Sequence, residues 1–247
     1  MARIDFNCDL GEGCGDDAAI LPWITSASIA CGAHAGDDAT MRATLRSCRV
    51  HGVAAGAHPG YADPAHFGRR EHALSADDLR ALIDGQLRRL AALAADEGIR
   101  LAHVKPHGAL YNLAARDRGV ADVVAAAVHA FDPSLVLFGL AGSDAIRAGE
   151  AAGLRVAREA FAERAYDGDG SLAPRGSEGA VLAELEPALR QVRLIVRERE
   201  VVARDGTRVP LHADTLCLHG DRPGAAGFAR ALRAQLEAEG ITVEAPH

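Results

Sequence analysis

Residues 101–112 read LAHVKPHGALYN, a short apolar run that ends in two basic side chains, Lys105 and His107. Short runs with so few polar groups are typical of strands that are covered on both faces. Pro106 restrains the backbone, so two side chains that are two residues apart on an extended segment are expected to project to the same side. The stretch therefore predicts a buried strand with chemistry at its C-terminal end.

Similar apolar runs recur along the chain. The expected strands are residues 4–8, 28–31, 53–57, 101–105, 135–140, 154–158 and 215–218. Amphipathic helices are expected between several of them, at residues 38–49, at 224–239, and from a capping box at Ser75–Asp78 to a stop at Gly98. The Asp205-Gly206 pair predicts a hairpin turn. No linker or repeat divides the chain, so we expect a single domain over residues 1–247.

Alternating strands and helices predict a parallel sheet, either open or closed into a barrel. The positions of polar side chains help to distinguish an open sheet from a barrel. Such side chains lie at the C-terminal end of nearly every expected strand. They are Asn7 and Asp9, His34, His58, Lys105 and His107, Glu159, and His219 with Asp221. A barrel gathers such groups around one axis, whereas an open sheet concentrates them at one switch point. The pattern favours an α/β fold of the TIM-barrel-like (β/α) type.

Composition excludes several classes of protein. The formal net charge of −7 argues against nucleic acid as a partner, because phosphate binding needs a basic face. The chain contains no run of about 18 apolar residues, so no membrane span is expected. Its first residues lack the apolar stretch of a signal peptide, so none is expected. Five scattered cysteines without a C-x-x-C pair indicate reduced thiols. We therefore expect a cytoplasmic protein.

Rare residue types mark the segments that carry chemistry. Lys105 is the only lysine, and Asn7 and Asn112 are the only asparagines. They and the three tyrosines, Tyr111 among them, fall in segments rich in Gly, His and Asp, which we expect to be loops and not helices. Lysine is a compact point charge that can orient an oxygen, which arginine does less well. This difference predicts that Lys105 is retained for chemistry.

Further motifs supply carboxylates, histidines and arginines. NCDLGEG (7–13) carries Asp9 and Glu12, and SIACGAHAGDD (28–38) and GAHPGY (56–61) carry His34 and His58 after a shared Gly-Ala-His core. EAFAERAYDGDGSLAPR (159–175) offers Glu159, Arg164, Tyr166 and Arg175, while HADTLCLHGD (212–221) offers Asp214 and His219. A histidine beside glycine at a strand end can serve as a metal ligand, an acid or base, or an anion donor. His51, His66, His72, His129 and His247 lack that setting and are expected at the surface.

Some sequence signatures of catalysis are absent. The sequence contains neither a phosphate-binding P-loop, nor a G-x-S-x-G nucleophile elbow, nor a G-x-G-x-x-G dinucleotide fingerprint. These absences disfavour a serine hydrolase and a self-sufficient P-loop ATPase.

Taken in order, NCDLGEG, SIACGAHAGD, GAHPGY with FGRR after it, VKPHGALYN, EAFAERAYDGDGSLAPR and ADTLCLHGD resemble the LamB/YcsF lactam-utilisation family. The resemblance covers residues 4 to about 239. It implies a seven-stranded (β/α) barrel similar to that of the glycoside hydrolase/deacetylase superfamily. It also implies ATP-dependent opening of 5-oxo-L-proline to L-glutamate, with two partner subunits, B and C.

Opening a lactam requires groups that stabilise oxyanion charge, activate water and hold the substrate carboxylate. Our hypothesis gives oxyanion or phosphate stabilisation to Lys105, acid–base work to His107 and His58, and orientation of a histidine or water to Asp9. Arg69 or Arg70 would clamp a carboxylate or phosphate. The other expected binding residues are Asn7, Glu12, His34, Tyr111, Asn112, Glu159, Arg164, Asp214 and His219. ATP, bound with Mg²⁺, is the expected co-substrate.

Two other interpretations stay open. A metal-dependent deacetylase would use Asp9, His34 and His58 as ligands around an open position. Such sites usually place two histidines four residues apart, whereas His34 is followed there by Asp38, so no tightly bound transition metal is expected. A non-catalytic scaffold for subunits B and C is the third interpretation, and the density of ionisable groups argues against it.

Overall fold

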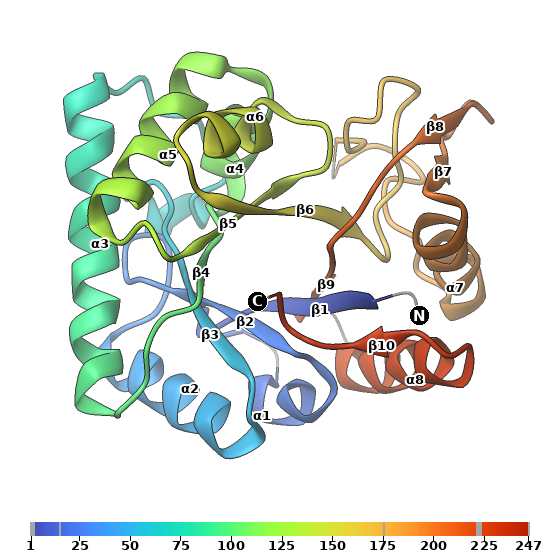
Figure 1. The fold of residues 1–247 in the computed structure, drawn as a ribbon, viewed down its shortest axis with the longest axis horizontal. Coiled ribbons are helices and arrows are strands. Elements are labelled where there is room, and N and C mark those ends of the chain that lie inside the picture. The colour runs from blue at the N-terminus through green and yellow to red at the C-terminus, as the bar shows by residue number, and fades with distance from the viewer. Residues whose placement is uncertain (1–2, 15, 175, 221–223, 247) are drawn as a thin grey trace.

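A computed structural model of the protein describes residues 3–14, 16–174, 176–220 and 224–246. Arg175, Asp221 and His247, which the sequence analysis named, lie outside the described residues. Within them, seven parallel strands close into a barrel with helices around it (Figure 1). The strands are β1 (Arg3–Leu10), β2 (Ser26–Ala30), β3 (Ala54–His58), β4 (His103–Val104), β5 (Val136–Leu140), β6 (Arg155–Phe161) and β9 (Thr215–His219).

The barrel closes where β1 pairs in parallel with β9, from Asp5 opposite Thr215 to Asp9 opposite His219. Each of the other strands pairs with its neighbour in chain order, and β6 pairs with β9. A short strand, β10 (Thr242–Val243), adds to the first residues of β1. The closed seven-stranded (β/α) barrel expected from the sequence is confirmed.

Helices cover the outside of the barrel (Figure 1). They are α1 (Asp17–Ile20), α2 (Asp38–His51), α3 (Ala76–Asp96), α4 (Gly108–Arg116), α5 (Arg118–Phe131), α6 (Asp144–Ala151), α7 (Leu185–Arg193) and α8 (Ala225–Ala238). Single helical turns at Leu21–Trp23, Pro64–His66 and Leu194–Glu198 complete the set. The hairpin of β7 (Glu200–Val202) and β8 (Arg208–Pro210) turns at Asp205-Gly206, as predicted.

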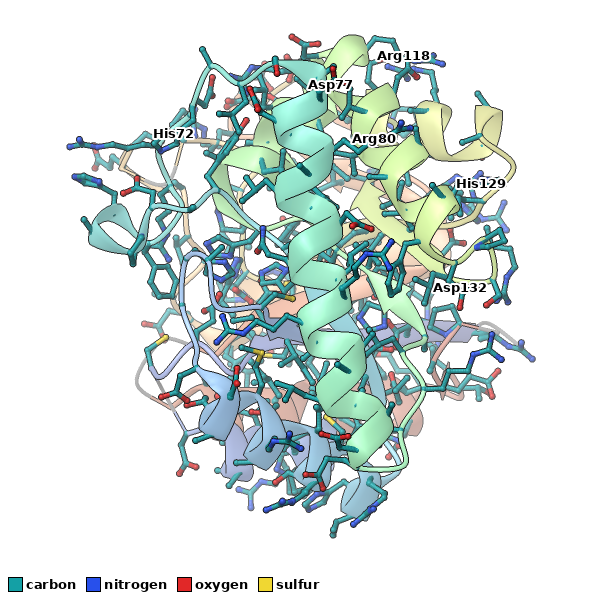
Figure 2. All side chains as sticks on the ribbon, turned by 90° about the vertical axis from the view of Figure 1, so that its left-hand side faces the viewer. His72, Asp77, Arg80, Arg118, His129 and Asp132 are labelled. Carbon is teal, nitrogen blue, oxygen red and sulfur yellow. The ribbon has the colours of Figure 1, made fainter. Side chains whose placement is uncertain are left out.

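In helix α3, the N-cap and the apolar face expected from the sequence determine how the helix packs on the barrel. The Ser75 hydroxyl oxygen accepts a hydrogen bond from the backbone N–H of Asp78 at 3.1 Å, so Ser75 caps the helix at the start that the predicted capping box gave. Leu79 and Ile83 face the barrel with 4% and 0% of their surface exposed, while Asp77 and Arg80 point to solvent (Figure 2). Each such buried Leu or Ile contributes about 1.5–3 kcal/mol relative to an exposed one. None of the described helices is long and apolar enough to cross a membrane.

The barrel interior is polar along β1. Asp5, Asn7 and Asp9 alternate with apolar residues at positions 4, 6, 8 and 10, which are buried in the main core. Near the N-terminal ends of the strands, Asp5 accepts hydrogen bonds from the hydroxyl groups of Thr25 at 2.6 Å and Thr215 at 2.5 Å. Burial raises the pKa of Asp5 to about 6, although these hydroxyl groups oppose the shift.

One glycine makes room for an interior side chain. A Cβ atom on Gly56 of β3 would lie 2.2 Å from Nε2 of His103 on β4. His103 is buried, stacks on Phe138, and lies 3.2 Å from the hydroxyl oxygen of Ser28. Only glycine at position 56 lets the imidazole occupy this part of the barrel.

Several element boundaries differ from the prediction. Strand β1 runs on to Leu10 and β6 to Phe161, so Asp9 and Glu159 belong to the strands themselves. Tyr111 and Asn112 lie on α4, which corrects the expectation that the rare residues avoid helices. The histidines at 51, 66, 72 and 129 are exposed, as predicted.

Candidate active site

A cavity of about 640 Å³ opens at the C-terminal ends of the strands. Its lining comes from segments that follow β1, β3, β4, β5, β6 and β9, which the sequence places far apart. Ten of the predicted site residues line it, among them Asp9, Glu12, His58, Lys105, His107 and His219. The expectation that polar strand ends converge on one face of a barrel therefore agrees with this geometry.

Lys105 lies at the base of the cavity, with 2% of its surface exposed. Its Nζ atom lies 2.9 Å from Asp9 Oδ1 and 2.8 Å from Glu159 Oε1. It also donates to the Asn7 side-chain oxygen at 3.2 Å and to Cys217 Sγ at 3.2 Å. An ammonium group has three protons, so these partners engage the whole donor capacity of the lysine.

Lys105 and Asp9 hold each other in their ionised forms. Burial alone would lower the pKa of Lys105, but Asp9, Cys217 and Glu159 raise it well above its usual value. Burial would likewise raise the pKa of Asp9, whereas His58 and Lys105 hold it well below the usual range. Both shifts have the direction expected for a buried ion pair. Lys105 therefore fixes two carboxylates in place.

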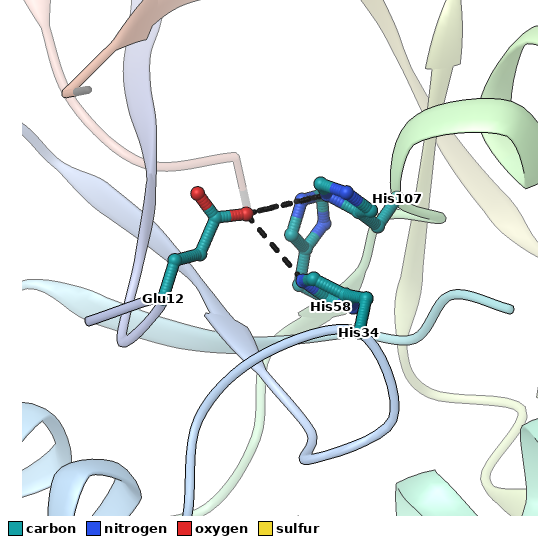
Figure 3. A group of neighbouring side chains, drawn as sticks. All are labelled: Glu12, His34, His58 and His107. Carbon is teal, nitrogen blue, oxygen red and sulfur yellow. Dashed lines mark hydrogen bonds and ion pairs between the residues drawn. The ribbon is translucent and has the colours of Figure 1, made fainter. Parts of the chain in front are cut away.

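A second cluster, Glu12, His34, His58 and His107, lies beside this network (Figure 3). Glu12 Oε1 lies 3.4 Å from His34 Nε2, 3.3 Å from His107 Nδ1 and 3.9 Å from His58 Nε2. Its carboxylate points at the imidazole rings in Figure 3. Among the described residues, Glu12 Oε1 and the ring nitrogens of His34 make no hydrogen bond besides these contacts of 3.3 Å and more. Buried polar atoms of this kind call for an explanation.

Backbone carbonyl groups orient two of the rings. His58 Nδ1 lies 2.7 Å from the carbonyl oxygen of Lys105, and His107 Nε2 lies 2.8 Å from that of Phe67. A carbonyl oxygen only accepts, so each of these nitrogens must carry a proton and donate. His58 Nε2 and His107 Nδ1, the remaining ring nitrogens, then face each other at 2.9 Å.

A third group, the pair of His219 and Glu163, joins the C-terminal ends of β9 and β6. His219, the last residue of β9, donates from its backbone N–H to Glu163 Oε1 at 3.0 Å, and its Nδ1 lies 2.5 Å from the same oxygen. Glu163 follows β6 and is almost completely buried. Because His219 lines the cavity, this carboxylate sets the orientation of an imidazole that a ligand would meet.

The other predicted site residues divide into two groups. Arg69, Tyr111, Asn112 and Arg164 line the cavity, and Arg164 also donates to the carbonyl oxygen of Ala173 at 2.5 Å. Asn7, His34 and Glu159 lie in the networks beneath the cavity surface.

Two predicted residues do not join the site. Arg70 is exposed and does not line the cavity, although Arg69 beside it does. Asp214 precedes β9, so it lies at the opposite end of the barrel, where it accepts from the backbone N–H of Arg158 at 2.9 Å. Asp214 does not join the site because it precedes its strand, whereas the cavity lies where the strands end.

Two residues of the site, Glu163 and Cys217, were not predicted from the sequence. Glu163 belongs to the motif that begins at Glu159, and its two-residue alternation with Glu159 and Phe161 was the available signal. Cys217 lies in the middle of an apolar strand, where a thiol looks like an ordinary small core residue. Only the closure of the barrel brings its sulfur to Lys105.

Two groups of side chains have the composition of metal ligands. Glu12, His34, His58 and His107 form one, and Asp9, Cys217 and His219 form the other, with the candidate ligand atoms within 4.8 Å of one another in each. In the second group the Lys105 ammonium contacts both Asp9 and Cys217. A cation is already present there, which disfavours another.

Comparison with known proteins agrees with this geometry. The sequence profile of the LamB/YcsF family matches residues 4–247. The chain is 54% identical to the 5-oxoprolinase A subunit of Chloroflexus aggregans and 49% identical to that of Geobacillus kaustophilus. These alignments cover all of this chain and 100% and 98% of the two relatives.

Solved structures show the same barrel. The lactam utilization protein of Thermus thermophilus superimposes with a TM-score of 0.93 at 45% identity, covering 99% of this chain and 100% of that one. The catalytic domain of a peptidoglycan N-acetylglucosamine deacetylase from Eubacterium rectale aligns over all of this chain and 89% of its own, with a TM-score of 0.53. At 10% identity, that likeness shows the fold alone. The match along almost the entire sequence is decisive: this chain belongs to the LamB/YcsF family.

Proposed function

We propose that the chain acts as the A subunit of a 5-oxoprolinase, an enzyme that opens the lactam ring of 5-oxo-L-proline to L-glutamate at the expense of ATP. The observation that carries the proposal is the 54% identity with a 5-oxoprolinase A subunit over the full length of both chains. The cavity at the C-terminal ends of the barrel strands supports it, because it gathers the acidic, imidazole and guanidinium groups that such a reaction uses.

The proposed reaction overcomes the low reactivity of an amide by activating its oxygen. The lactam oxygen attacks the γ-phosphorus of ATP, and ADP leaves. Water then adds to the activated carbon and gives its proton to a base, after which the C–N bond breaks as the ring nitrogen takes up a proton. The resulting γ-glutamyl phosphate reacts with a second water and releases glutamate and phosphate.

The side chains of the cavity suit these steps. His58, His107 and Asp9 lie side by side in the cavity lining, and a water bound next to them would be deprotonated there. Arg69 offers a guanidinium at the cavity surface for the substrate carboxylate or a phosphoryl group. We assign Lys105 a positioning role, because its ammonium already binds Asp9 and Glu159.

The proposal includes two 5-oxoprolinase partners, subunits B and C, and ATP bound with Mg²⁺ as co-substrate. The sequence lacks a P-loop, which supports the need for partners to handle the nucleotide. A cytoplasmic location, expected from the sequence, is part of the proposal because ATP is supplied there.

The test is 5-oxoproline-dependent release of ADP and formation of glutamate, measured for the purified chain alone and together with subunits B and C. We expect little or no turnover alone and coupled turnover with both partners. Rapid turnover by the chain alone would overturn the need for partners. Release of acetate from N-acetylated sugars, without use of ATP, would instead support the deacetylase interpretation.

A further inference from the structure

The facing ring nitrogens of His58 and His107 pose a physical problem. Each ring donates its other N–H to a carbonyl oxygen, so in the neutral rings His58 Nε2 and His107 Nδ1 both present lone pairs. These two atoms are 2.9 Å apart and belong to side chains that are almost completely buried. Two buried acceptors at this distance require a positive species, either a shared proton or a metal ion, between or beside them.

Oε1 of Glu12 is a third electron-rich atom close to the two facing ring nitrogens. It lies 3.3 Å from His107 Nδ1, 3.4 Å from His34 Nε2 and 3.9 Å from His58 Nε2, and it makes no other hydrogen bond among the described residues. For tetrahedral zinc, metal–ligand bonds of about 2.0–2.1 Å place the ligand atoms about 3.3 Å apart. The three observed separations, 2.9, 3.3 and 3.9 Å, scatter around that value.

His34 does not complete this set. Its ring stacks on that of His107 with an interplanar angle of 0° and a centroid separation of 3.7 Å. An imidazole lone pair lies in the plane of its ring, and two parallel planes this far apart share no point at which one ion could sit. The rings of His58 and His107 are instead nearly perpendicular, at 87°, so their planes intersect. His34 therefore packs against a ligand without being one.

We propose that Glu12, His58 and His107 bind one divalent transition-metal ion of the zinc class, with a fourth coordination position open to the cavity. All three residues line the cavity, whereas His34 does not. Two imidazoles and one carboxylate with an open position form a donor set typical of catalytic zinc. The carbonyl oxygens of Lys105 and Phe67 complete the site by fixing the ring orientations.

The spacing expected of a deacetylase metal site places two histidines four residues apart on one segment. The ligands of this site come instead from three different strand ends, after β1, at β3 and after β4. The inference also stands apart from the proposed function, because metal content is measured without 5-oxoproline, ATP or partner subunits. An ion at this position would bind the attacking water, and Asp9 Oδ2, 3.4 Å from His58 Nε2, lies within reach to accept its proton.

The experiment is titration of the chelator-treated chain with Zn²⁺ by calorimetry, with metal content measured after dialysis. We expect one Zn²⁺ per chain, and a visible absorption band of four-coordinate Co²⁺ when cobalt replaces it. Glu12→Gln, His58→Gln and His107→Gln should each lose more affinity than the roughly 10–100-fold typical of outer hydrogen-bond partners. His34→Phe, which retains a ring against His107, should bind Zn²⁺ within about threefold of the wild type.

His66→Gln is the matched control, because His66 is an exposed histidine that pairs with Asp63 and is none of the ligands named above. Melting temperatures verify that each variant is folded, and the cobalt spectrum of the wild type needs no variant. The proposal is overturned if the wild type binds neither Zn²⁺ nor Co²⁺ stoichiometrically, since a shared proton would then occupy the gap. Binding of Mg²⁺ in place of Zn²⁺, or loss of binding in His34→Phe alone, would also overturn it.

Discussion

Lys105 Nζ lies 2.8 Å from Glu159 Oε1, and this ion pair joins the end of β4 to β6 across the interior of the barrel. Glu159 is fully buried and Lys105 nearly so. The space between them suits a compact ammonium that meets two carboxylates at once, which explains why the one lysine of the chain stands at this position.

Replacement of Lys105 by methionine removes the cation that contacts both Asp9 and Glu159. Breaking a buried ion pair in this way costs roughly 3–5 kcal/mol of stability. We expect a matching fall in the free energy of unfolding, measured by urea titration. Arg88→Met is the control, because Arg88 pairs with Asp84 on the exposed face of α3 and should cost less than about 1 kcal/mol. Equal effects of the two substitutions would contradict the assigned role of Lys105.

Arg69 and Arg70 form a matched pair for the substrate site, since only Arg69 lines the cavity. Arg69→Ala should raise the KM for 5-oxoproline or for ATP about 10- to 100-fold, because a hydrogen bond to a charged group contributes about 1.5–3 kcal/mol. Arg70→Ala should leave both KM values unchanged. The measurement is steady-state turnover of the chain with subunits B and C. A larger effect at Arg70 would exclude Arg69 as the anion-binding residue.

The raised pKa of Asp5 should make the free energy of unfolding depend on pH. This pKa rises from 3.8 in the unfolded chain to about 6 in the folded protein, so the folded state binds more protons between these values. Stability from this group is therefore fully present below pH 3.8 and is lost as the pH rises towards 6, by about 3 kcal/mol.

Asp5→Asn cannot titrate, so its unfolding free energy should lack this contribution to the pH dependence. The difference in unfolding free energy between wild type and variant, measured by urea titration at pH 4.5 and pH 7, should shift in favour of the variant at the higher pH. Taking this difference cancels the contributions of the groups that both proteins share. A difference that does not change with pH would show that Asp5 titrates normally.

Two glycines should respond in opposite ways to the same substitution. Gly56→Ala forces a methyl group to within 2.2 Å of the His103 ring, and overpacking of this kind costs about 1–3 kcal/mol. Gly85→Ala lies on the exposed side of α3 with nothing within 4 Å, and should stabilise the helix by about 0.5–1 kcal/mol. Melting temperatures of the two variants provide the test, and shifts of the same sign would refute it.

Local patterns predicted much of this molecule. The strands were visible because each is short and apolar, and the capping box at Ser75 located the start of α3. The polar residues at strand ends predicted that His58, Lys105 and His219 would share one site, because a barrel directs all its C-terminal strand ends to one face.

What the sequence could not reveal is which side chains from distant segments touch. The contact of His58 with His107 depends on the pairing of β3 with β4, not on any spacing along one segment. The rarity of Tyr111 predicts a loop, whereas the residue lies on α4, because rarity in the sequence carries no information about the local backbone. The pairing of Glu163 with His219 likewise exists only once β6 lies beside β9.

The hydrogen bond between Thr215 and Asp5 joins residues 210 positions apart, and it lies at the seam where β9 meets β1. Contacts between such distant segments form slowly, because the intervening chain must first lose its freedom. During folding, the half-formed sheet from β1 to β6 therefore carries two free edges and an unfinished charge network, since Cys217 arrives only with β9. Until β9 pairs with both β1 and β6, those free edges are able to pair with strands of other chains.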